Sequence, residues 1–391
     1  MTNTPTLHHG YLETRSRPLW FQYALALTFA CVLSIPLFAL HGGQGEISPF
    51  ENRRVQERPA LEPRLALLRA YPAAFERWFN DNFGSRVALT RLDHWVRAVA
   101  LRTSPVAKVL IGRDGWLYFT GEDARALDRY YRGIEPLSNA EVRALYTELE
   151  RRRAFLASKG IAYLVVVAPD KYSVYPEFLP SWVQKLSAQT ALDRISEEMQ
   201  RHPDLHFIDL RSALIAAKSS EQLYFKTDSH WNYAGARVAY RVLMTEVARL
   251  LPGVEVAAPP ATEYVPGKDR YSGDLSTMLG LPGRFSEDDV APLGKVLAAS
   301  GARCPQRVAG IDTPGFETYG YRCERPPQRT ALVYRDSMAI SLIPMLSENF
   351  ARVTYVSSRK LDRALVDRLH PDIVIEELVE RSLEMPAALP M

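Results

Sequence analysis

The most apolar stretch of the chain covers residues 18–40 and holds 23 residues without a charged side chain. As a helix rising 1.5 Å per residue it would be about 34 Å long, enough to cross the hydrocarbon core of a bilayer. Arg15 and Arg17 precede it, and the positive-inside rule then keeps residues 1–17 in the cytoplasm and sends the rest of the chain outward. We therefore predict a cytoplasmic tail and a transmembrane anchor. A cleaved signal peptide is the alternative, but the stretch is long for one and no clear A-x-A site follows it.

The segments that follow the anchor change character twice. Residues 41–60 are polar and hold several glycines and prolines, which predicts a linker, and residues 61–103 carry an aromatic-rich helical pattern. The run IGRDGWLYF over 111–119 predicts a tight turn at Asp114–Gly115 that leads into a short strand.

From residue 138 onward, continuous apolar runs alternate with amphipathic helical patterns. Ser138 with Glu141 indicates a capping box, and Asn232 is a candidate N-cap. We expect a helix that starts at Ser138 and ends before Gly160, and helices over about 186–200, 233–251, 338–349 and 361–369. We expect strands over 161–169, 206–210, 330–335, 352–356 and 372–377. Strands of this kind, alternating with helices, predict an α/β fold with a parallel, doubly wound sheet and helices on both faces.

Residues 252–330 break the alternation because they are rich in Pro and Gly and show little periodicity. We predict an insertion or cap within one domain over 61–391. Cys304 and Cys323 lie in this stretch, and in an exported chain a disulfide between them is plausible, with two free or buried thiols as the alternative. Cys31 lies within the predicted anchor.

Composition excludes several classes of protein. The chain has 48 Lys and Arg against 45 Asp and Glu, a net charge of +3 without a dense basic block, which argues against a nucleic-acid partner. A mean hydropathy of −0.17 excludes a multi-span membrane protein but leaves room for a single span. The sequence has no CxxC motif and no Cys/His cluster of the kind that binds structural zinc. We expect neither a cofactor nor a metal.

The first chemical candidate is TDSHWNYAGA (227–236), where Asp228 and His230 follow a strand and precede a helix. Residues i and i+2 of an extended segment point to the same side, and a carboxylate beside an imidazole fixes its tautomer and stabilises the imidazolium. Alone, D-x-H is a weak pattern, and a structural histidine is the alternative. A metal site is less favoured because only one histidine lies near the carboxylates.

The second candidate is Ser337 in VYRDSMA (333–339), just past an apolar strand and at the start of a predicted helix. Nucleophiles collect at this edge of open α/β sheets, and helix N–H groups can hold an oxyanion. The alternative is that Ser337 only caps the helix. Together with His230 and Asp228, it supplies a nucleophile, a base and the group that orients the base. Ser276 in GDLSTMLG is not predicted to be a nucleophile, since no apolar strand precedes it.

Seven motifs occur in a defined order, and in this order they resemble a known family. They are FENRRVQERPAL (50–61), WFNDNFGSR (78–86), GRDGWLYF (112–119), APDKYSVYPEFLP (168–180), DSHWN (228–232), GDLSTMLG (273–280) and the strand followed by RDSM (335–338). The series is similar to that of the alginate O-acetyltransferase family of SGNH-hydrolase-like proteins, the AlgJ/AlgX type, and it covers about residues 46–382.

The resemblance implies a circularly permuted, three-layer α/β/α SGNH-hydrolase-like domain in the bacterial periplasm. With the anchor predicted over 18–40, we expect a single-pass protein of the inner membrane. It implies acetylation of an exported polysaccharide, in exopolysaccharide biosynthesis, beside a multi-span membrane acyltransferase that supplies the acetyl group. By motif, Ser337 matches the nucleophile, His230 the base and Asp228 its orienting group.

The sequence departs from SGNH proteins at two points. Arg335 stands where Gly is usual in Gly-Asp-Ser, and Glu376 and Glu377 stand where an oxyanion-binding Asn is general. We expect the Ser337 N–H and Arg335 to hold the oxyanion instead. An acetyl esterase with the same triad, and a non-catalytic polysaccharide-binding scaffold, are the alternatives to an acetyltransferase, and a cytoplasmic role is a third.

Overall fold

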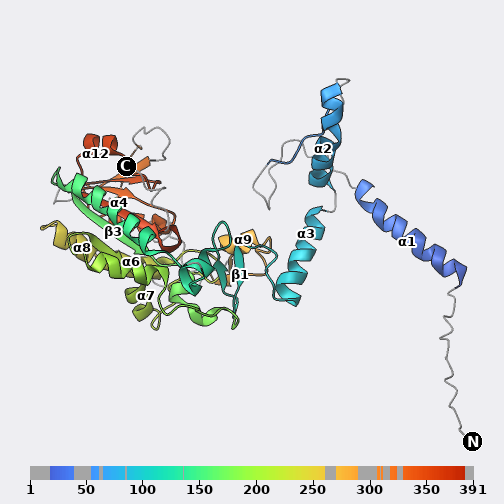
Figure 1. The fold of residues 1–391 in the computed structure, drawn as a ribbon, viewed down its shortest axis with the longest axis horizontal. Coiled ribbons are helices and arrows are strands. Elements are labelled where there is room, and N and C mark those ends of the chain that lie inside the picture. Colours follow the sequence, from blue (N-terminus) through green and yellow to red (C-terminus); the bar gives the residue numbers. More distant parts are fainter. Residues whose placement is uncertain are drawn as a thin grey trace, which may run out of the picture. The chain divides into compact units, whose positions relative to one another are not determined.

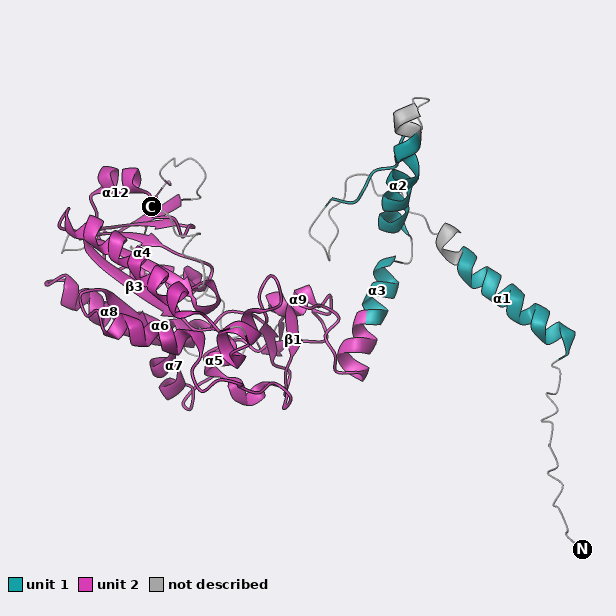
Figure 2. Cartoon of the chain, in the orientation of Figure 1, with its two compact units in different colours: residues 1–93 teal, residues 94–391 magenta. Residues whose placement is uncertain are grey.

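The computed structural model describes residues 18–38, 54–60, 65–83, 86–134, 136–259, 270–288, 306–308, 310, 318–323 and 329–383. The chain divides into two compact units, residues 1–93 and 94–391 (Figure 2). The predicted tail over 1–17 and most of the predicted linker over 41–60 lie outside the described residues.

The first unit contains α1 (Leu19–Phe38), α2 (Leu65–Asn82) and most of α3 (Arg86–Trp95). The helical pattern predicted over 61–103 is thus confirmed, and the aromatic rings of α2 stack on one another four residues apart, as Phe75 does on Phe79. In the described part of the chain, none of the helices combines the length and the apolar character that a membrane crossing requires. The anchor over 18–40 stays a prediction.

The second unit is built on a seven-stranded sheet with the order β4-β3-β11-β9-β10-β8-β7. Figure 1 labels β3 of this sheet and the helices α4, α6 and α8 drawn around it. The strands are β3 (Ala162–Ala168), β4 (His206–Asp209), β7 (Gln306–Val308), β8 (Thr318–Arg322), β9 (Thr330–Tyr334), β10 (Arg352–Val356) and β11 (Ile373–Val379). The five strands predicted from sequence are all present, and they pair in parallel.

The sheet is mixed rather than wholly parallel, because β8 pairs antiparallel with β10, and β7 pairs antiparallel with β8. Both strands come from the stretch over 252–330 that was predicted to be an insertion or cap. Near this edge of the sheet only one face needs to be apolar, and of the run TYGYR in β8 only Gly320 is buried. Such a strand lacks the continuous apolar run that identified the central strands.

Helices cover both faces of the sheet, since successive residues of β3 and of β11 are buried although they point to opposite sides. α4 packs with α6, α8 packs with α7 and α11, and both α4 and α8 contact β3. These helices are α4 (Asn139–Ala157), α6 (Ala191–Gln200), α7 (Arg211–Ala217), α8 (Tyr233–Leu250), α11 (Ile343–Ser347) and α12 (Arg363–Leu369). The capping box of Ser138 and Glu141 and the N-cap by Asn232 are confirmed.

The predicted helix over 338–349 is divided into a 3₁₀ turn, η4 (Met338–Ser341), and α11. Pro344 stands in the first turn of α11, where its missing N–H and its ring are tolerated, whereas within one continuous helix they would not be. Ser337 therefore precedes a single 3₁₀ turn and not the macrodipole of a long helix.

A smaller group of elements lies beside the sheet. It comprises the hairpin β1 (Val109–Ile111) and β2 (Leu117–Phe119), the hairpin β5 (Arg270–Tyr271) and β6 (Glu287–Asp288), α9 (Asp274–Met278), α5 (Lys171–Val174) and the short turns η1 (Val96–Ala100), η2 (Leu127–Arg132), η3 (Pro176–Phe178) and η5 (Glu380–Ser382). The predicted turn at Asp114–Gly115 is confirmed, with φ of 55° and 80°. Leu117 of β2 and Leu275 of α9 share a small apolar cluster separate from the main core.

The structure describes two of the three cysteines. Cys323 is buried and disulfide-bonded, and Cys31 is free. The predicted partner of Cys323, Cys304, lies outside the described residues.

Candidate active site

Asp228 and His230 lie at the tip of a tight loop, residues 223–232, which we call the base loop. An isolated bridge between Tyr224 and Trp231 closes this loop, and both aromatic side chains are fully buried. At Gly235, in the first turn of α8, a Cβ would lie 2.3 Å from the Leu223 carbonyl oxygen. Only glycine lets the helix approach the loop this closely, so the local sequence fixes the base loop against α8.

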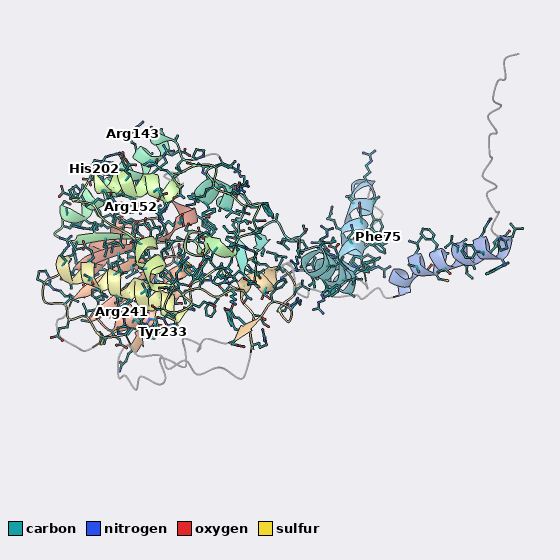
Figure 3. The ribbon with its side chains drawn as sticks, turned by 90° about the horizontal axis from the view of Figure 1, so that it is seen from below. Phe75, Arg143, Arg152, His202, Tyr233 and Arg241 are labelled. Atoms are coloured by element: carbon teal, nitrogen blue, oxygen red, sulfur yellow. The ribbon has the colours of Figure 1, made fainter. Side chains whose placement is uncertain are left out.

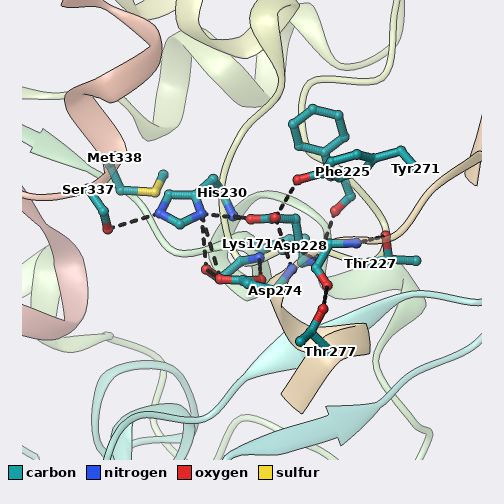
Figure 4. A network of polar contacts seen from close by, with 12 residues as sticks. Lys171, Phe225, Thr227, Asp228, His230, Tyr271, Asp274, Thr277, Ser337 and Met338 are labelled. Atoms are coloured by element: carbon teal, nitrogen blue, oxygen red, sulfur yellow. Dashed lines mark hydrogen bonds and ion pairs between the residues drawn. The ribbon is translucent and has the colours of Figure 1, made fainter. Parts of the chain in front are cut away.

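The structure brings together all three residues predicted from sequence (Figure 4). The Nδ1 atom of His230 lies 2.7 Å from Oδ1 of Asp228, and the Nε2 atom lies 2.9 Å from Oγ of Ser337. The Asp228 carboxylate also accepts the backbone N–H of His230 at 3.0 Å. This is the geometry of a nucleophile, a base and the carboxylate that orients the base.

Ser337 follows the C-terminal end of β9 and is exposed. Its hydroxyl does not cap η4. Instead, the carboxylate of the preceding residue, Asp336, accepts the N–H groups of Met338 at 2.8 Å and of Val379 at 2.7 Å. The capping role proposed as the alternative for Ser337 thus belongs to Asp336, and the Ser337 hydroxyl is left to contact His230.

The Asp228 carboxylate and the His230 imidazolium each stabilise the charged form of the other. Burial acts to raise the pKa of Asp228, but the hydrogen bond and charge of His230 outweigh it and hold that pKa well below its ordinary value. Burial acts to lower the pKa of His230, and the hydrogen bond and charge of Asp228, with the charge of Asp274, outweigh it and raise that pKa. A base that must take up the serine proton is favoured by such surroundings.

A third segment, residues 270–288, contributes residues that sequence reasoning missed. The Tyr271 hydroxyl donates to Oδ2 of Asp228 at 2.6 Å, and the Asp274 N–H donates to the same oxygen at 3.1 Å. Both lie in or beside GDLSTMLG, whose Gly-Asp pair was the available signal. Ser276 of that motif is fully buried and donates to the Phe285 carbonyl at 2.7 Å.

Lys171 holds the base loop from another side. The residue begins α5, directly after β3, and its side chain is buried. Its ammonium donates to the carbonyl oxygens of Phe225, Lys226 and Asp228 at 2.9, 3.0 and 2.6 Å. Burial lowers the pKa of Lys171 to about 7. Because all three N–H donors are used on main-chain carbonyls, Lys171 fixes the backbone that carries Asp228.

The two glutamates expected at the position of the oxyanion-binding Asn have other partners. Glu376 is buried in β11 and binds the fully buried Arg152, at 2.7 Å from each of its oxygens (Arg152 is labelled in Figure 3). Glu377 accepts the Asp336 N–H at 3.1 Å. The Arg335 guanidinium lies over the Tyr319 ring at 5.3 Å and donates to the Asp336 carbonyl. In the described part of the chain, the Ser337 N–H has no acceptor and stays the candidate oxyanion donor.

Asp228, His230 and Asp274 are also the one group of side chains, within the described residues, that could hold a metal ion, with ligand atoms within 4.8 Å of one another. Each of these three side chains is already engaged in hydrogen bonds within the base loop or to it. A cavity of about 1510 Å³ is lined by Thr227 and Asn232 of the base loop, but by none of the three predicted triad residues.

Comparison with known proteins finds relatives for part of the chain. Residues 109–293 match the model of the SGNH hydrolase-like domain of the acetyltransferase AlgX. The "Probable alginate O-acetylase AlgJ" of Azotobacter vinelandii is 27% identical over 262 residues, 66% of this chain and 61% of that protein. Its namesake in Pseudomonas syringae pv. tomato is 30% identical over 181 residues, 46% of this chain and 43% of that protein.

The chain thus spans less than two thirds of the length of these relatives. Among solved structures, Bacillus cereus PatB1 with a sulfonyl adduct shares the fold, with a TM-score of 0.50 and 14% identity over 70% of this chain and 97% of that chain. The chain is thus similar to the SGNH hydrolase-like domain of AlgX over residues 109–293, which include Asp228 and His230, and to the curated AlgJ proteins over part of their length.

Proposed function

We propose that this chain is a polysaccharide O-acetyltransferase that works through an acetyl-enzyme on Ser337. The observation that carries the proposal is the continuous chain of hydrogen bonds from Asp228 through His230 to the exposed hydroxyl of Ser337. The names of the curated relatives, alginate O-acetylases, support an exported polysaccharide as the acceptor.

In the first half-reaction the Ser337 oxygen attacks the acetyl carbonyl while its proton passes to Nε2 of His230. The Ser337 N–H donates a hydrogen bond to the carbonyl oxygen and stabilises the negative charge that develops on it. Asp228 holds the imidazolium in place. When the tetrahedral intermediate collapses, the bond to the donor's leaving group breaks and that group takes the proton from His230, leaving acetyl-Ser337.

In the second half-reaction a sugar hydroxyl takes the place of the leaving group. His230 removes its proton as the hydroxyl oxygen attacks the acetyl carbon, and the proton then returns to Ser337 as the ester bond to the enzyme breaks. Water in place of the sugar would make the same site an esterase. The acceptor therefore decides between the two activities, and exclusion of water from the acetyl-enzyme is what a transferase requires.

The test is acetyl transfer from p-nitrophenyl acetate to oligosaccharides by the whole chain, with acetyl-enzyme detected by intact-protein mass spectrometry. We expect Ser337→Ala to abolish both, and Ser220→Ala, at an exposed serine, to leave both unchanged. Transfer by Ser337→Ala at the wild-type rate would refute the proposal. Acetyl-enzyme that only water discharges would indicate an esterase, and glycan binding without acetyl-enzyme would indicate a scaffold.

The anchor over 18–40, a periplasmic location at the bacterial inner membrane and a multi-span acyltransferase as acetyl donor belong to the same proposal. Protease treatment of spheroplasts tests the topology, because the exported part should be degraded while an epitope within residues 1–17 is protected. Recovery of the whole chain in the soluble fraction would contradict the anchor, and protection of the whole chain would contradict export.

A further inference from the structure

We propose that Asp274 is a positioning residue of the active site: it fixes Ser229, the residue between Asp228 and His230, and it places a second negative charge opposite the imidazole. The inference rests on the proposed function, because it concerns how His230 is kept ready to act as a base. It assigns a role to a segment that the sequence pattern described only as part of an insertion.

Asp274 holds the base loop through both of its carboxylate oxygens and through its backbone. Oδ1 accepts the Ser229 N–H at 2.7 Å, and Oδ2 accepts the Ser229 hydroxyl at 2.5 Å (Figure 4). The Asp274 N–H donates to Oδ2 of Asp228 at 3.1 Å. These three bonds tie the first residue of α9 to the two residues that precede His230.

The hydroxyl of Ser229 lies 3.2 Å from Nδ1 of His230. A hydroxyl has one proton to donate, and here Asp274 receives it, so the Ser229 oxygen can only accept from Nδ1–H. Nδ1 then carries its proton toward Asp228 and Ser229, which leaves Nε2 free to accept from Ser337. Asp274 thereby acts through Ser229 to reinforce the tautomer of His230 that Asp228 sets and that a base requires.

Helix capping does not account for Asp274. The residue stands in the first turn of α9, but no side chain caps this helix. Gly273 instead lets the segment over 270–288 approach the base loop closely. A Cβ at this position would lie 2.5 Å from the Asp228 Cβ and from the Thr227 carbonyl oxygen. The Thr277 hydroxyl closes the turn by donating to the Gly273 carbonyl at 3.1 Å.

Asp274 acts on His230 through its charge as well as through its hydrogen bonds. Oδ2 lies 3.8 Å from Nδ1, and among the causes that raise the pKa of His230 the Asp274 charge follows those from Asp228. The charged or titratable groups around the two residues are Asp228, Lys171, Tyr271, Glu287 and Arg381, of which Arg381 opposes Asp274 at His230. Removal of the Asp274 charge should therefore lower the pKa of His230.

The experiment compares Asp274→Asn and Ser229→Ala with wild type in the whole chain. The control is Asp288→Asn, an exposed carboxylate on the same segment. The readouts are the pH profile of kcat/KM with p-nitrophenyl acetate and the titration of the His230 ring by NMR. A base misplaced by up to about 1 Å loses about 10- to 100-fold in rate, so we expect a loss of this size in both variants. We expect the acid limb and the His230 titration to move to lower pH in Asp274→Asn only.

A wild-type rate and an unmoved acid limb in Asp274→Asn would overturn the proposal, while inactivity of Ser337→Ala would still support the proposed function. The NMR titration reports on Asp274 even where no activity is found, so the two proposals fail separately. Should Asp274→Asn not fold, Ser229→Ala decides, because this variant leaves the carboxylate and the backbone bonds in place. A wild-type rate in Ser229→Ala would then exclude the action through Ser229.

Discussion

Gly273 offers a direct test of how tightly the segment over 270–288 is fitted to the base loop. The Cβ of Gly273→Ala would lie 2.5 Å from the Asp228 Cβ and 2.6 Å from its Cα. The φ of Gly273 is −76°, which alanine adopts freely, so steric contact is the whole perturbation. Because ordinary carbon–carbon contacts begin at about 3.5 Å, the two main chains must separate by about 1 Å.

Two effects of known size follow from this separation. Inserting a methyl group into a packed site costs about 1–3 kcal/mol, which lowers the melting temperature by several degrees in a chain of this size. A shift of about 1 Å in a group that orients the base costs about 100-fold in rate. We expect Gly273→Ala to lower kcat/KM by about this factor while the protein stays folded at 25 °C.

The assay is kcat/KM with p-nitrophenyl acetate beside thermal unfolding followed by circular dichroism. Gly283→Ala is the matched control, because Gly283 lies in the same segment and no atom lies within 4 Å of the added Cβ. If Gly273→Ala and Gly283→Ala have the same rate and the same melting temperature, the close packing of this segment on Asp228 is refuted.

Three further predictions concern the supports of the site. Lys171→Met leaves three carbonyl oxygens without their donor, at about 1–3 kcal/mol each, so we expect urea unfolding to show a loss of free energy of unfolding on the order of 3–9 kcal/mol; an unchanged midpoint would contradict this. Arg152→Met leaves the buried Glu376 carboxylate without its partner and should lower the free energy of unfolding by about 3–5 kcal/mol. The double variant Arg152→Met, Glu376→Leu should recover most of this loss, as equilibrium unfolding of both variants would show. The pKa of His230 is raised above 6.5, and the base must be neutral, so kcat/KM should fall as the pH decreases through a value above 6.5; an acid limb below 6.5 would contradict it.

The sequence predicts the central strands and the triad because both carry local signals. β3 and β9 are almost wholly apolar runs, and β11 is apolar except for Glu376 and Glu377. Asp228 and His230 are two positions apart, after one strand and before a helix. Ser337 is identified by its place after a strand, and this identification does not require knowing that His230 contacts it.

The features that sequence reasoning missed depend on contacts between distant residues. Tyr271 and Asp274 reach Asp228 from 43 and 46 positions away, out of a stretch without periodicity. β8, which lies next to the edge strand β7, carries tyrosines, a glycine and an arginine, so its sequence resembles that of a loop. The break at Pro344 is visible in the sequence, but whether a proline kinks a helix or starts a new one depends on how the chain packs around it.

The position of β11 has a consequence for the order in which the molecule is completed. β11 comes last among the described strands of the sheet, yet it pairs with β3 on one side and with β9 on the other. Until it arrives, the β4–β3 pair and the β9–β10–β8–β7 group each have an open, apolar edge that invites pairing with other chains. Its Val379 N–H also holds the Asp336 carboxylate beside Ser337. The nucleophile is therefore set in place by the strand that is synthesised last among those described, and a growing chain completes its active site only when this strand enters the middle of the sheet.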